Sequence, residues 1–433
     1  MKIDRLRTID QTKLINSKEG EKMSENSNSG EKIAIHTPSA QLSSSAVSTE
    51  KSKAGKSPSK FKQFFWGDKK AKIRVVSIVL PAVLLIALVA SVYVRYFKNE
   101  SNLPNEPKSN ILQTITRPKV KKVASPLSGI EYNEDIATRH PLGVVVENHS
   151  DARPQSGLSR AEIVYEAIAE GGITRFMAIF GPREAQEIGP VRSARTFFLD
   201  WIQEYDGYFA YAGGSKDGLA QIISDNVKSL PHTQGYFERK SRGNVASEHT
   251  LFTSTKDLYN LAEKKGFGKT ANFTTLNFKD DAKLEDRGDQ EKITINFSTN
   301  VYQVDWLYDK EQNIYKRVLA GASHKDDKTG EQLTAKNIII QKVDHRYITF
   351  PEDPTAKGVW RFTDIGQGEA WVIYDGKMQK ATWKKSSVKD RTRLFDSSGD
   401  EIKFNRGVFW YEIIHPDITF NESKVVDTNP DKN

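Results

Sequence analysis

The sequence predicts one N-terminal transmembrane helix followed by an α/β ectodomain and then a β-rich C-terminal domain. Three observations lead to this fold class. Twenty uncharged, mostly apolar residues stand at 75–94, short apolar runs alternate with helix-like patterns over 129–270, and a period-two pattern takes over at 271–417. The 433-residue chain is 37% hydrophobic and 10% aromatic, which suits globular domains with their own cores.

Composition excludes several classes of protein. Cysteine is absent, which rules out disulfides, thiolate metal sites, a cysteine nucleophile and a lipid-modified cysteine. The net charge is +8, but residues 1–74 hold 16 Lys and Arg against 8 Asp and Glu, and the remainder holds 48 of each. Because the folded part is formally neutral, we expect no nucleic-acid partner.

The N-terminal region predicts attachment to a membrane through a single span. Residues 1–74 are Ser/Lys-rich and predict a disordered basic cytoplasmic tail, and either Met1 or Met23 can be the true start. The run "VVSIVLPAVLLIALVASVYV" is about as long as a bilayer core, and a cleaved signal peptide is disfavoured because the preceding segment is far too long. Lys and Arg are more frequent before this run than after it, so residues after about 96 should be extracytoplasmic.

The segments that follow predict a stalk, two domains and a polar tail. Residues 95–128 are Pro/Asn/Lys-rich and predict the stalk, and the tail covers 418–433. In the α/β domain we expect strands at "LGVVVEN", "ITRFMAIF" and "GYFAYAG", and helices at "SRAEIVYEAIAE", "VRSARTFFLDWIQEY", "DGLAQIIS" and "TKDLYNLAEKK". In the β-rich domain, "VYQVDWLYD" places Tyr302, Val304, Trp306 and Tyr308 on one face of a strand, and the Asp375-Gly376 step predicts a hairpin.

Several longer motifs occur in a fixed order. The first three are "PLGVVVENHSDARPQSGLSRAEIVYEAIAEGGITRFMAIF", "IGPVRSARTFFLDWIQEYD" and "YAGGS", and "NIYKRVLAGASHKDDKTGEQLTAKNIIIQ", "GQGEAWVIYDGKMQKATWKK" and "FDSSGDEIKFNRGVFWYEI" follow. Together they resemble the YerB-like family of bacterial lipoproteins. The resemblance implies a membrane-attached, extracytoplasmic protein of two consecutive domains of unknown function, and it assigns no reaction. Without a lipobox cysteine, the helix at 75–94 would replace the lipid anchor.

The stretch "EIGPVRSART" places two arginines where a helix is expected to begin. Gly189 can serve as N-cap and Pro190 as first helical residue, with the helix running over 191–205. Arg192 and Arg195 would then share one face of the first turn, where the helix dipole already carries positive character. Two guanidinium groups at that position call for an anion nearby.

The anion is either an external ligand or a protein carboxylate, and the sequence leaves both open. An external anion would be bound by Arg192, Arg195, Arg175, Ser193 and the turn formed by Gly213, Gly214 and Ser215. The internal alternative pairs the arginines with Glu162, Glu166, Glu170 or Asp151. The turn matches neither the P-loop nor the dinucleotide-binding fingerprint.

The end of the first strand carries the residues most suited to chemistry. Glu147, His149 and Asp151 are candidates for acid/base catalysis or metal ligation, and the structural alternative is a polar loop before a capping box at Ser159 and Glu162. Histidines are few and irregularly spaced, so no metal and no cofactor is predicted. Ser193 lies outside any nucleophile motif.

Three functional hypotheses follow. The first is noncatalytic binding of an anionic cell-envelope component or a cell-wall-synthesis partner. The second is a hydrolase or other enzyme acting on envelope polymer, and the third is a structural scaffold whose arginines pair internally. The sequence leaves the oligomeric state and the type of envelope undetermined.

Overall fold

The computed structural model describes residues 85–92, 95, 121–349 and 358–425. The predicted tail at 1–74, most of the predicted span and stalk, and residues 426–433 of the polar tail lie outside these ranges. Residues 85–92 are helical. Among the described residues, no helix is both long and apolar enough to cross a membrane. Residues 113–433 form one compact unit, and the fold and sites below belong to it.

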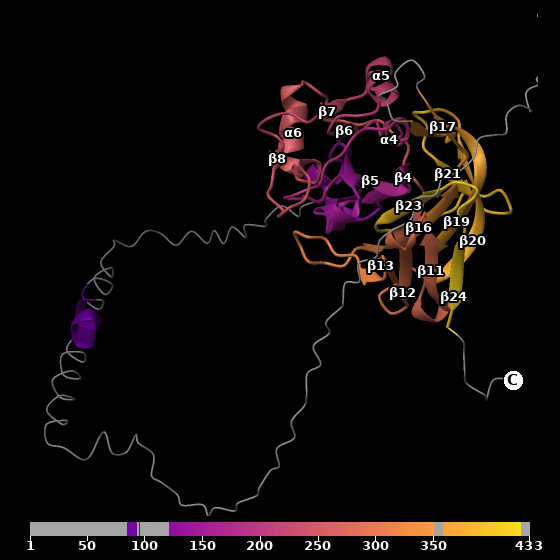
Figure 1. The fold of residues 1–433 in the computed structure, drawn as a ribbon. Coiled ribbons are helices and arrows are strands. Elements are labelled where there is room, and N and C mark those ends of the chain that lie inside the picture. The colour runs from indigo at the N-terminus through magenta and orange to yellow at the C-terminus, as the bar shows by residue number, and fades with distance from the viewer. Residues whose placement is uncertain (1–84, 93–94, 96–120, 350–357, 426–433) are drawn as a thin grey trace, which may run out of the picture. The chain divides into compact units, whose positions relative to one another are not determined.

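The compact unit is rich in strands and has few helices (Figure 1). Its main sheet has ten strands in the order β21-β20-β19-β16-β23-β4-β5-β3-β6-β7. Their bounds are β3 Leu142–Glu147, β4 Ile163–Glu170, β5 Ile173–Phe180, β6 Tyr208–Tyr211, β7 Ser229–Pro231, β16 Asn337–Lys342, β19 Gly366–Tyr374, β20 Lys377–Lys385, β21 Arg393–Phe395 and β23 Phe409–Ile414. Because β23 pairs in parallel with both β16 and β4, strands from both halves of the chain share this sheet.

A second sheet follows the order β14-β13-β12-β11-β24, with β15 paired to β13. The bounds are β11 Gln290–Asn296, β12 Gln303–Asp309, β13 Ile314–Leu319, β14 Ala322–Ser323, β15 Thr334–Ala335 and β24 Phe420–Lys424. Smaller antiparallel pairs are β1 Lys122–Ala124 with β2 Glu131–Asn133, β8 Glu238–Arg239 with β9 Leu251–Phe252, and β17 His345–Ile348 with β18 Val359–Phe362, while β10 Phe278–Lys279 and β22 Phe404–Asn405 are parallel. The helices are α3 Glu134–Ala137, α4 Thr196–Gln203, α5 Lys216–Ser224 and α6 Thr255–Lys264.

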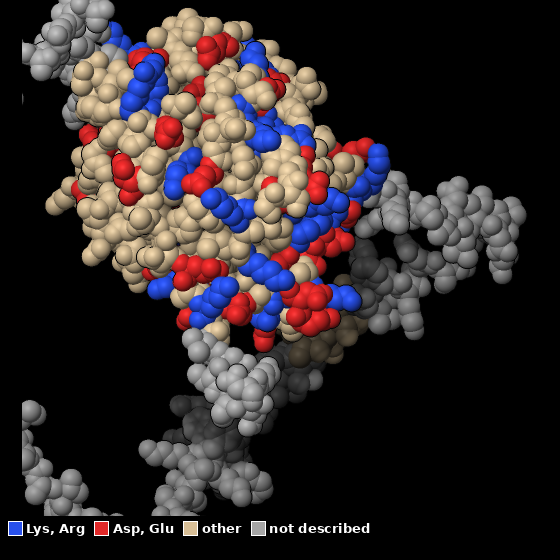
Figure 2. All heavy atoms as spheres, turned by 90° about the vertical axis from the view of Figure 1, so that its right-hand side faces the viewer, with Lys and Arg blue, Asp and Glu red and all other residues tan. Residues whose placement is uncertain are grey.

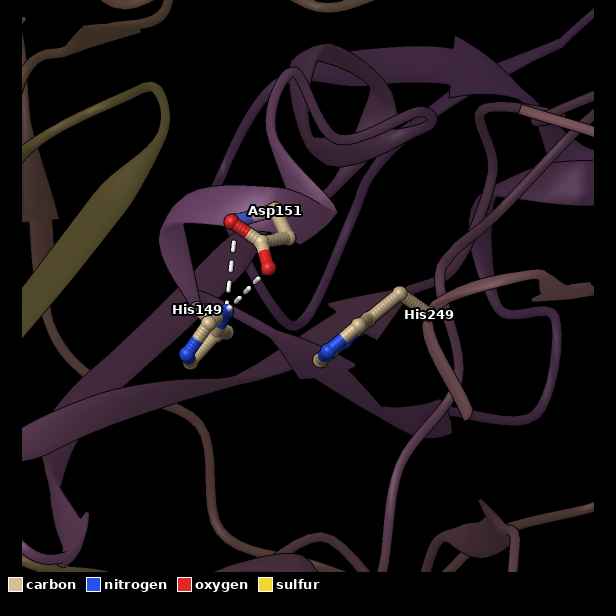
Figure 3. Close-up of side chains that lie close together, drawn as sticks. All are labelled: His149, Asp151 and His249. Carbon is tan, nitrogen blue, oxygen red and sulfur yellow. Dashed lines mark hydrogen bonds and ion pairs between the residues drawn. The ribbon is translucent and has the colours of Figure 1, made fainter. Parts of the chain in front are cut away.

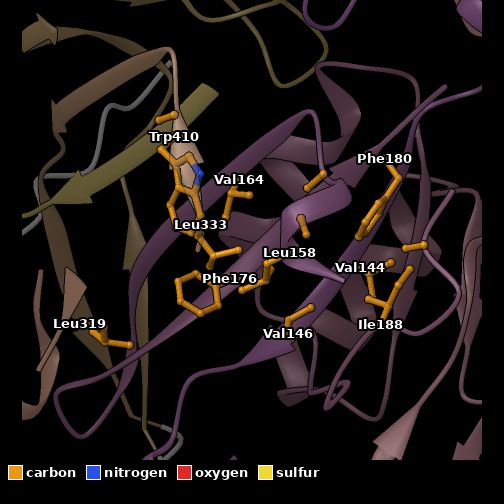
Figure 4. Packing of buried hydrophobic residues seen from close by; sticks show 14 of the residues in the cluster. Val144, Val146, Leu158, Val164, Phe176, Phe180, Ile188, Leu319, Leu333 and Trp410 are labelled. Carbon is orange, nitrogen blue, oxygen red and sulfur yellow. The ribbon is translucent and has the colours of Figure 1, made fainter. Parts of the chain in front are cut away.

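The main sheet is buried on both faces, which explains why its strands read as continuous apolar runs. Along β3, Val144 and Val146 join the core drawn in Figure 4, whereas Val145 joins the core on the other face, beneath α4. The predicted hairpin at Asp375-Gly376 is confirmed, since the two residues link β19 to β20 with φ angles of 52° and 69°.

One predicted helix was wrong, and another begins later than predicted. "SRAEIVYEAIAE" forms strand β4 after a short 3-10 turn, so Ser159 and Glu162 make no capping box. Helix α4 begins at Thr196, five residues later than expected, because residues 188–194 are extended and bridge to neighbouring segments at Val146↔Val191 and Ala194↔Gly214. Arg192 therefore precedes the helix and Arg195 occupies its N-cap position.

A buried charge triad joins the two halves of the compact unit. Arg317 on β13 pairs with Glu166 on β4, and its Nη1 lies 3.7 Å from Oε1 of Glu412 on β23. All three side chains are fully buried. Trp306 donates from Nε1 to Glu412 Oε1 at 2.8 Å. The triad is thus a polar connection between β4, β13 and β23 inside an apolar core.

Stability should depend on pH through Glu412. Burial, followed by the charge of Glu166, raises the pKa of Glu412 from 4.5 to about 8, against the opposing charge of Arg317. Between these values the folded chain keeps a proton that the unfolded chain releases, so the free energy of unfolding falls as pH rises through this window. We expect wild type to lose about 1–3 kcal/mol more than Glu412→Gln between pH 5 and 8 in urea titrations. Parallel pH profiles for the two proteins would contradict this.

The surface carries both signs of charge. On the face shown in Figure 2, Lys and Arg lie among Asp and Glu, with no broad region of one sign. This agrees with the equal counts of basic and acidic residues after residue 74.

Candidate functional site at the end of strand β3

Strand β3 delivers a cluster of charged and imidazole side chains to its carboxyl end. Glu147 closes the strand and is 1% exposed. His149 then caps a 3-10 turn over Ser150–Ala152, where its Nδ1 accepts a hydrogen bond from the Asp151 backbone N–H at 3.2 Å. The side chains of His149 and Asp151 are 34% and 58% exposed. The strand therefore ends with a buried carboxylate beneath a solvent-facing imidazole and carboxylate.

The extended segment around Arg192 lies beside this strand end. Glu147 N donates to Pro190 O and Arg192 N donates to Val145 O, both at 2.9 Å. The Arg192 guanidinium pairs through Nε with the Glu147 carboxylate, and its Nη2 is 3.5 Å from Glu248 Oε1. Its side chain remains 19% exposed. Arg192 thus has a buried partner and a more distant, exposed one.

Arg175 and Arg195 converge on a different carboxylate, Glu170 at the end of β4. Arg195 Nη2 lies 2.6 Å from Glu170 Oε2, and Arg175 pairs with the other oxygen. Burial opposes ionisation of Glu170, but the charges and hydrogen bonds of both arginines outweigh it and lower its pKa to about 2. Arg175 also lies 3.7 Å from Glu147. Both arginine side chains are almost fully buried, so an internal carboxylate already occupies them.

Two of the predicted carboxylate partners pair with other arginines, and the predicted anion-binding turn packs against the protein. Glu162 pairs with Arg183 and Glu166 with Arg317, so neither contacts the arginines of "VRSAR". Ser193 donates from Oγ to Ala212 O at 3.1 Å, and Ala194 bridges to Gly214. Ser215 caps α5 by accepting from Gly218 N at 3.3 Å. The Gly213-Gly214-Ser215 turn therefore packs against the arginine segment through its backbone.

His249 completes a group that local sequence did not reveal. It ends a 3-10 turn at Ser247–His249, is 5% exposed, and stacks on His149 with ring centroids 4.9 Å apart. Donor atoms of His149, Asp151 and His249 all lie within 4.8 Å of one another (Figure 3). Since His249 lies 98 positions after Asp151, no short spacing motif could identify this group.

The surroundings of His249 favour its neutral form. Its Nδ1 is buried without a hydrogen-bond partner among the described residues and lies 3.8 Å from Glu147 Oε2. Burial lowers the pKa of His249, and Arg192 adds to this while Glu147 opposes it. A neutral imidazole with an unpaired nitrogen can coordinate a metal ion. Two imidazoles and a carboxylate, with Arg192 beside them, are a group able to hold a transition metal and an anion together.

Comparison with known proteins places this chain in a class of proteins built from two consecutive domains of unknown function. The family models described as "Protein of unknown function (DUF3048)" match residues 127–268 with the N-terminal domain and 293–411 with the C-terminal domain. The chain is 32% identical over 310 residues to "Putative lipoprotein YerB" of Bacillus subtilis (strain 168), covering 69% of this chain and 88% of that protein. The crystal structure of the YerB protein from Bacillus subtilis matches with a TM-score of 0.61 at 29% identity, covering 69% of this chain and all of that one. The chain belongs to the YerB-like DUF3048 family.

Proposed function

We propose that this chain is a membrane-associated, extracytoplasmic protein that binds an anionic cell-envelope component through a divalent transition metal and Arg192. The observation that carries the proposal is the grouping of His149, Asp151 and His249 donor atoms within 4.8 Å. Imidazole nitrogen and carboxylate oxygen are the ligands that zinc takes in proteins. The sequence alone predicted no metal, because these residues are brought together only by the fold.

Membrane association is supported from two directions. The relative in Bacillus subtilis is named as a lipoprotein, and lipoproteins are held at membranes by their lipid. This chain lacks cysteine but has a twenty-residue uncharged apolar run at 75–94 with more Lys and Arg before it than after it. We therefore assign anchoring to this run, with the N-terminus in the cytoplasm and residues after about 96 outside.

The anionic ligand is inferred from the coordination position left open on the metal and from the partly exposed guanidinium of Arg192. Three protein donors leave a fourth zinc position open. Arg192 is the partly exposed arginine of the cluster, and its contact with Glu248 at 3.5 Å is weak enough for a ligand to replace. Arg175 and Arg195 support the site from below, since Glu170 holds both. Carboxylates and phosphates fit both the metal and the guanidinium.

The metal site is tested by zinc titration of the full-length, tag-free chain after chelation. We expect one zinc ion per chain by calorimetry, and at least about tenfold weaker binding in His249→Gln. His232→Gln is the matched control, because His232 is exposed and lies outside the group. Equal zinc affinity in His249→Gln and wild type, or the absence of stoichiometric binding in wild type, would refute the metal site.

A metal-dependent hydrolase is the second candidate, and the three-donor set favours it. Catalytic zinc sites keep three protein ligands and an open position for water, whereas structural sites fill all four. Glu147 is buried and paired with arginines, so we assign proton acceptance to the exposed Glu248, which precedes His249 in the chain and lies 3.5 Å from Arg192. Soluble fragments released from purified envelope polymer by the zinc-loaded chain, and not by His149→Gln, would favour this reaction over binding alone.

A further inference from the structure

A cavity of about 580 Å³ lies between helices α4 and α5, strands β17 and β18 and the segment that follows β18. Residues from both family domains line it, among them Asp200, Asp217, Gln221, Arg361, Phe362 and Asp364. It shares no residue with the group of His149, Asp151 and His249. Its volume falls within the range of small-molecule sites, and junctions between domains are where such sites often occur.

One side of this cavity is acidic, and one of its carboxylate oxygens has no hydrogen-bond partner in the part of the chain that the structure describes. Asp364 is 3% exposed, and its Oδ2 has no hydrogen bond to any described residue. Among the described residues the nearest cation is Lys385 at 4.0 Å, which is already bound by Glu204 at 2.9 Å and donates to the backbone oxygen of Asp200 at 2.8 Å. A buried carboxylate oxygen without a donor is costly, so a donor from outside the chain would stabilise it.

The raised pKa values of the two aspartates on this side of the cavity agree with a site that takes a cation. Burial, followed by the charges of Asp200 and Glu204, raises the pKa of Asp364 to about 7 against the opposing charge of Lys385. Burial also raises the pKa of Asp200, whose side chain accepts a hydrogen bond from Gln221 at 2.7 Å. An ammonium group placed between the two carboxyl groups would restore their ordinary ionisation.

The other side of the cavity offers a free donor. Arg361 pairs through Nη2 with Asp217 at 2.9 Å, but its Nε is buried and donates to no described residue. Arg346 lines the same cavity. Apolar surface from Phe362 and from Ile365, which is 42% exposed, lies beside these charged groups. The cavity therefore combines an unsatisfied acceptor, an unsatisfied donor and an apolar wall.

We propose that this cavity binds a zwitterionic ligand of the amino-acid or short-peptide class. Its ammonium group lies against Asp364 and Asp200, and its carboxylate accepts from Arg361 Nε. A simple anion would face three aspartates, of which Asp217 is paired with Arg361, and a simple cation would leave Arg361 Nε without an acceptor among the described residues. Only a ligand with both groups completes both sides, while Phe362 and Ile365 contact its side chains.

The test uses the full-length chain in an uncharged detergent and alanyl-alanine as the probe, in its L,L and D,D forms. We expect at least one isomer to bind by calorimetry and to raise the unfolding temperature. N-acetyl-alanyl-alanine lacks the ammonium group and alanyl-alanine amide lacks the carboxylate, so each should bind at least tenfold more weakly. If the cavity holds only water, neither isomer binds folded wild type and the proposal fails. Equal binding of the blocked forms also refutes it.

Variants assign the binding to this cavity. Asp364→Asn and Arg361→Gln should each weaken dipeptide binding at least tenfold, whereas Asp280→Asn and Arg406→Gln, on the exposed surface, should not. Wild-type affinity in both cavity variants would overturn the assignment. Should Asp364→Asn fail to fold, Arg361→Gln still decides, because that side chain is 41% exposed. His249→Gln should bind the dipeptide normally, so failure of the metal site and failure of this cavity are separate results.

Discussion

The Arg317→Met variant is expected to lose about 3–5 kcal/mol of its free energy of unfolding. Arg317 is fully buried, pairs with Glu166 and lies 3.7 Å from Glu412. Its guanidinium also stacks over the Trp410 ring at 4.5 Å from the centroid. Methionine keeps much of the volume but leaves two buried carboxyl groups without a cation. Urea unfolding followed by tryptophan fluorescence measures the loss.

An exposed arginine provides the matched control for Arg317. Arg406 pairs with Asp280, and their side chains are 43% and 95% exposed. Surface pairs of this kind contribute about 0–1 kcal/mol, so Arg406→Met should unfold nearly as wild type does. A similar loss in both variants would mean that burial does not set the contribution of the Arg317 triad.

Strand β4 was predicted as a helix, and the spacing of its glutamates explains the error. In "SRAEIVYEAIAE" the glutamates recur every four residues, which on a helix marks one polar face. On a strand the same spacing also marks one face, and in β4 both faces are buried. Glu166 is polar because Arg317, 151 residues later, lies against it. In the sequence, a glutamate that forms a buried ion pair therefore looks the same as one on a solvent-exposed helix face. Its arginine partner becomes evident only in the folded structure.

The helix start predicted in "EIGPVRSART" was wrong for a related reason. Gly189 and Pro190 suit a helix start locally, yet Val191 N donates to Leu251 O at 2.7 Å and Ala194 N donates to Gly213 O at 2.9 Å. These backbone hydrogen bonds to residues distant in sequence stabilise an extended conformation, so the helix begins only at Thr196. Strands such as β3 and β5 were predictable because their apolar runs are local signals that tertiary contacts only reinforce.

The candidate site also has one part that the sequence predicts and one part that only the fold brings together. His149 and Asp151 are near neighbours in sequence, so their proximity could be predicted. Their approach to His249 depends on the turn at Ser247–His249 and could not be predicted from spacing. No local sequence pattern marked His249 as a neighbour of His149 and Asp151.

The Glu204→Gln variant is the second large expected loss, again about 3–5 kcal/mol. Glu204 is 1% exposed and binds Lys385 at 2.9 Å and Arg391 at 2.7 Å, and Thr392 donates to it from both its backbone N–H and its hydroxyl. Burial opposes ionisation, but the charges of Lys385 and Arg391 outweigh it and lower the pKa of Glu204. Glutamine keeps the shape but leaves the buried Arg391 without a carboxylate and leaves Lys385 with only the more distant Asp364, at 4.0 Å. Urea unfolding at pH 7 measures the difference.

The pH dependence identifies the cause of that loss. A carboxyl group with a lowered folded pKa stabilises the protein above its unfolded pKa of 4.5, and this contribution disappears as pH falls through the folded value. Wild type and Glu204→Gln should therefore converge in acid, whereas Glu134→Gln, in an exposed pair with Lys121, should follow wild type throughout. A constant difference at every pH would point to packing instead of charge. Because Glu204 holds Lys385 away from Asp364, the folded fraction of Glu204→Gln should also bind alanyl-alanine more weakly, as the released ammonium group competes with that of the ligand.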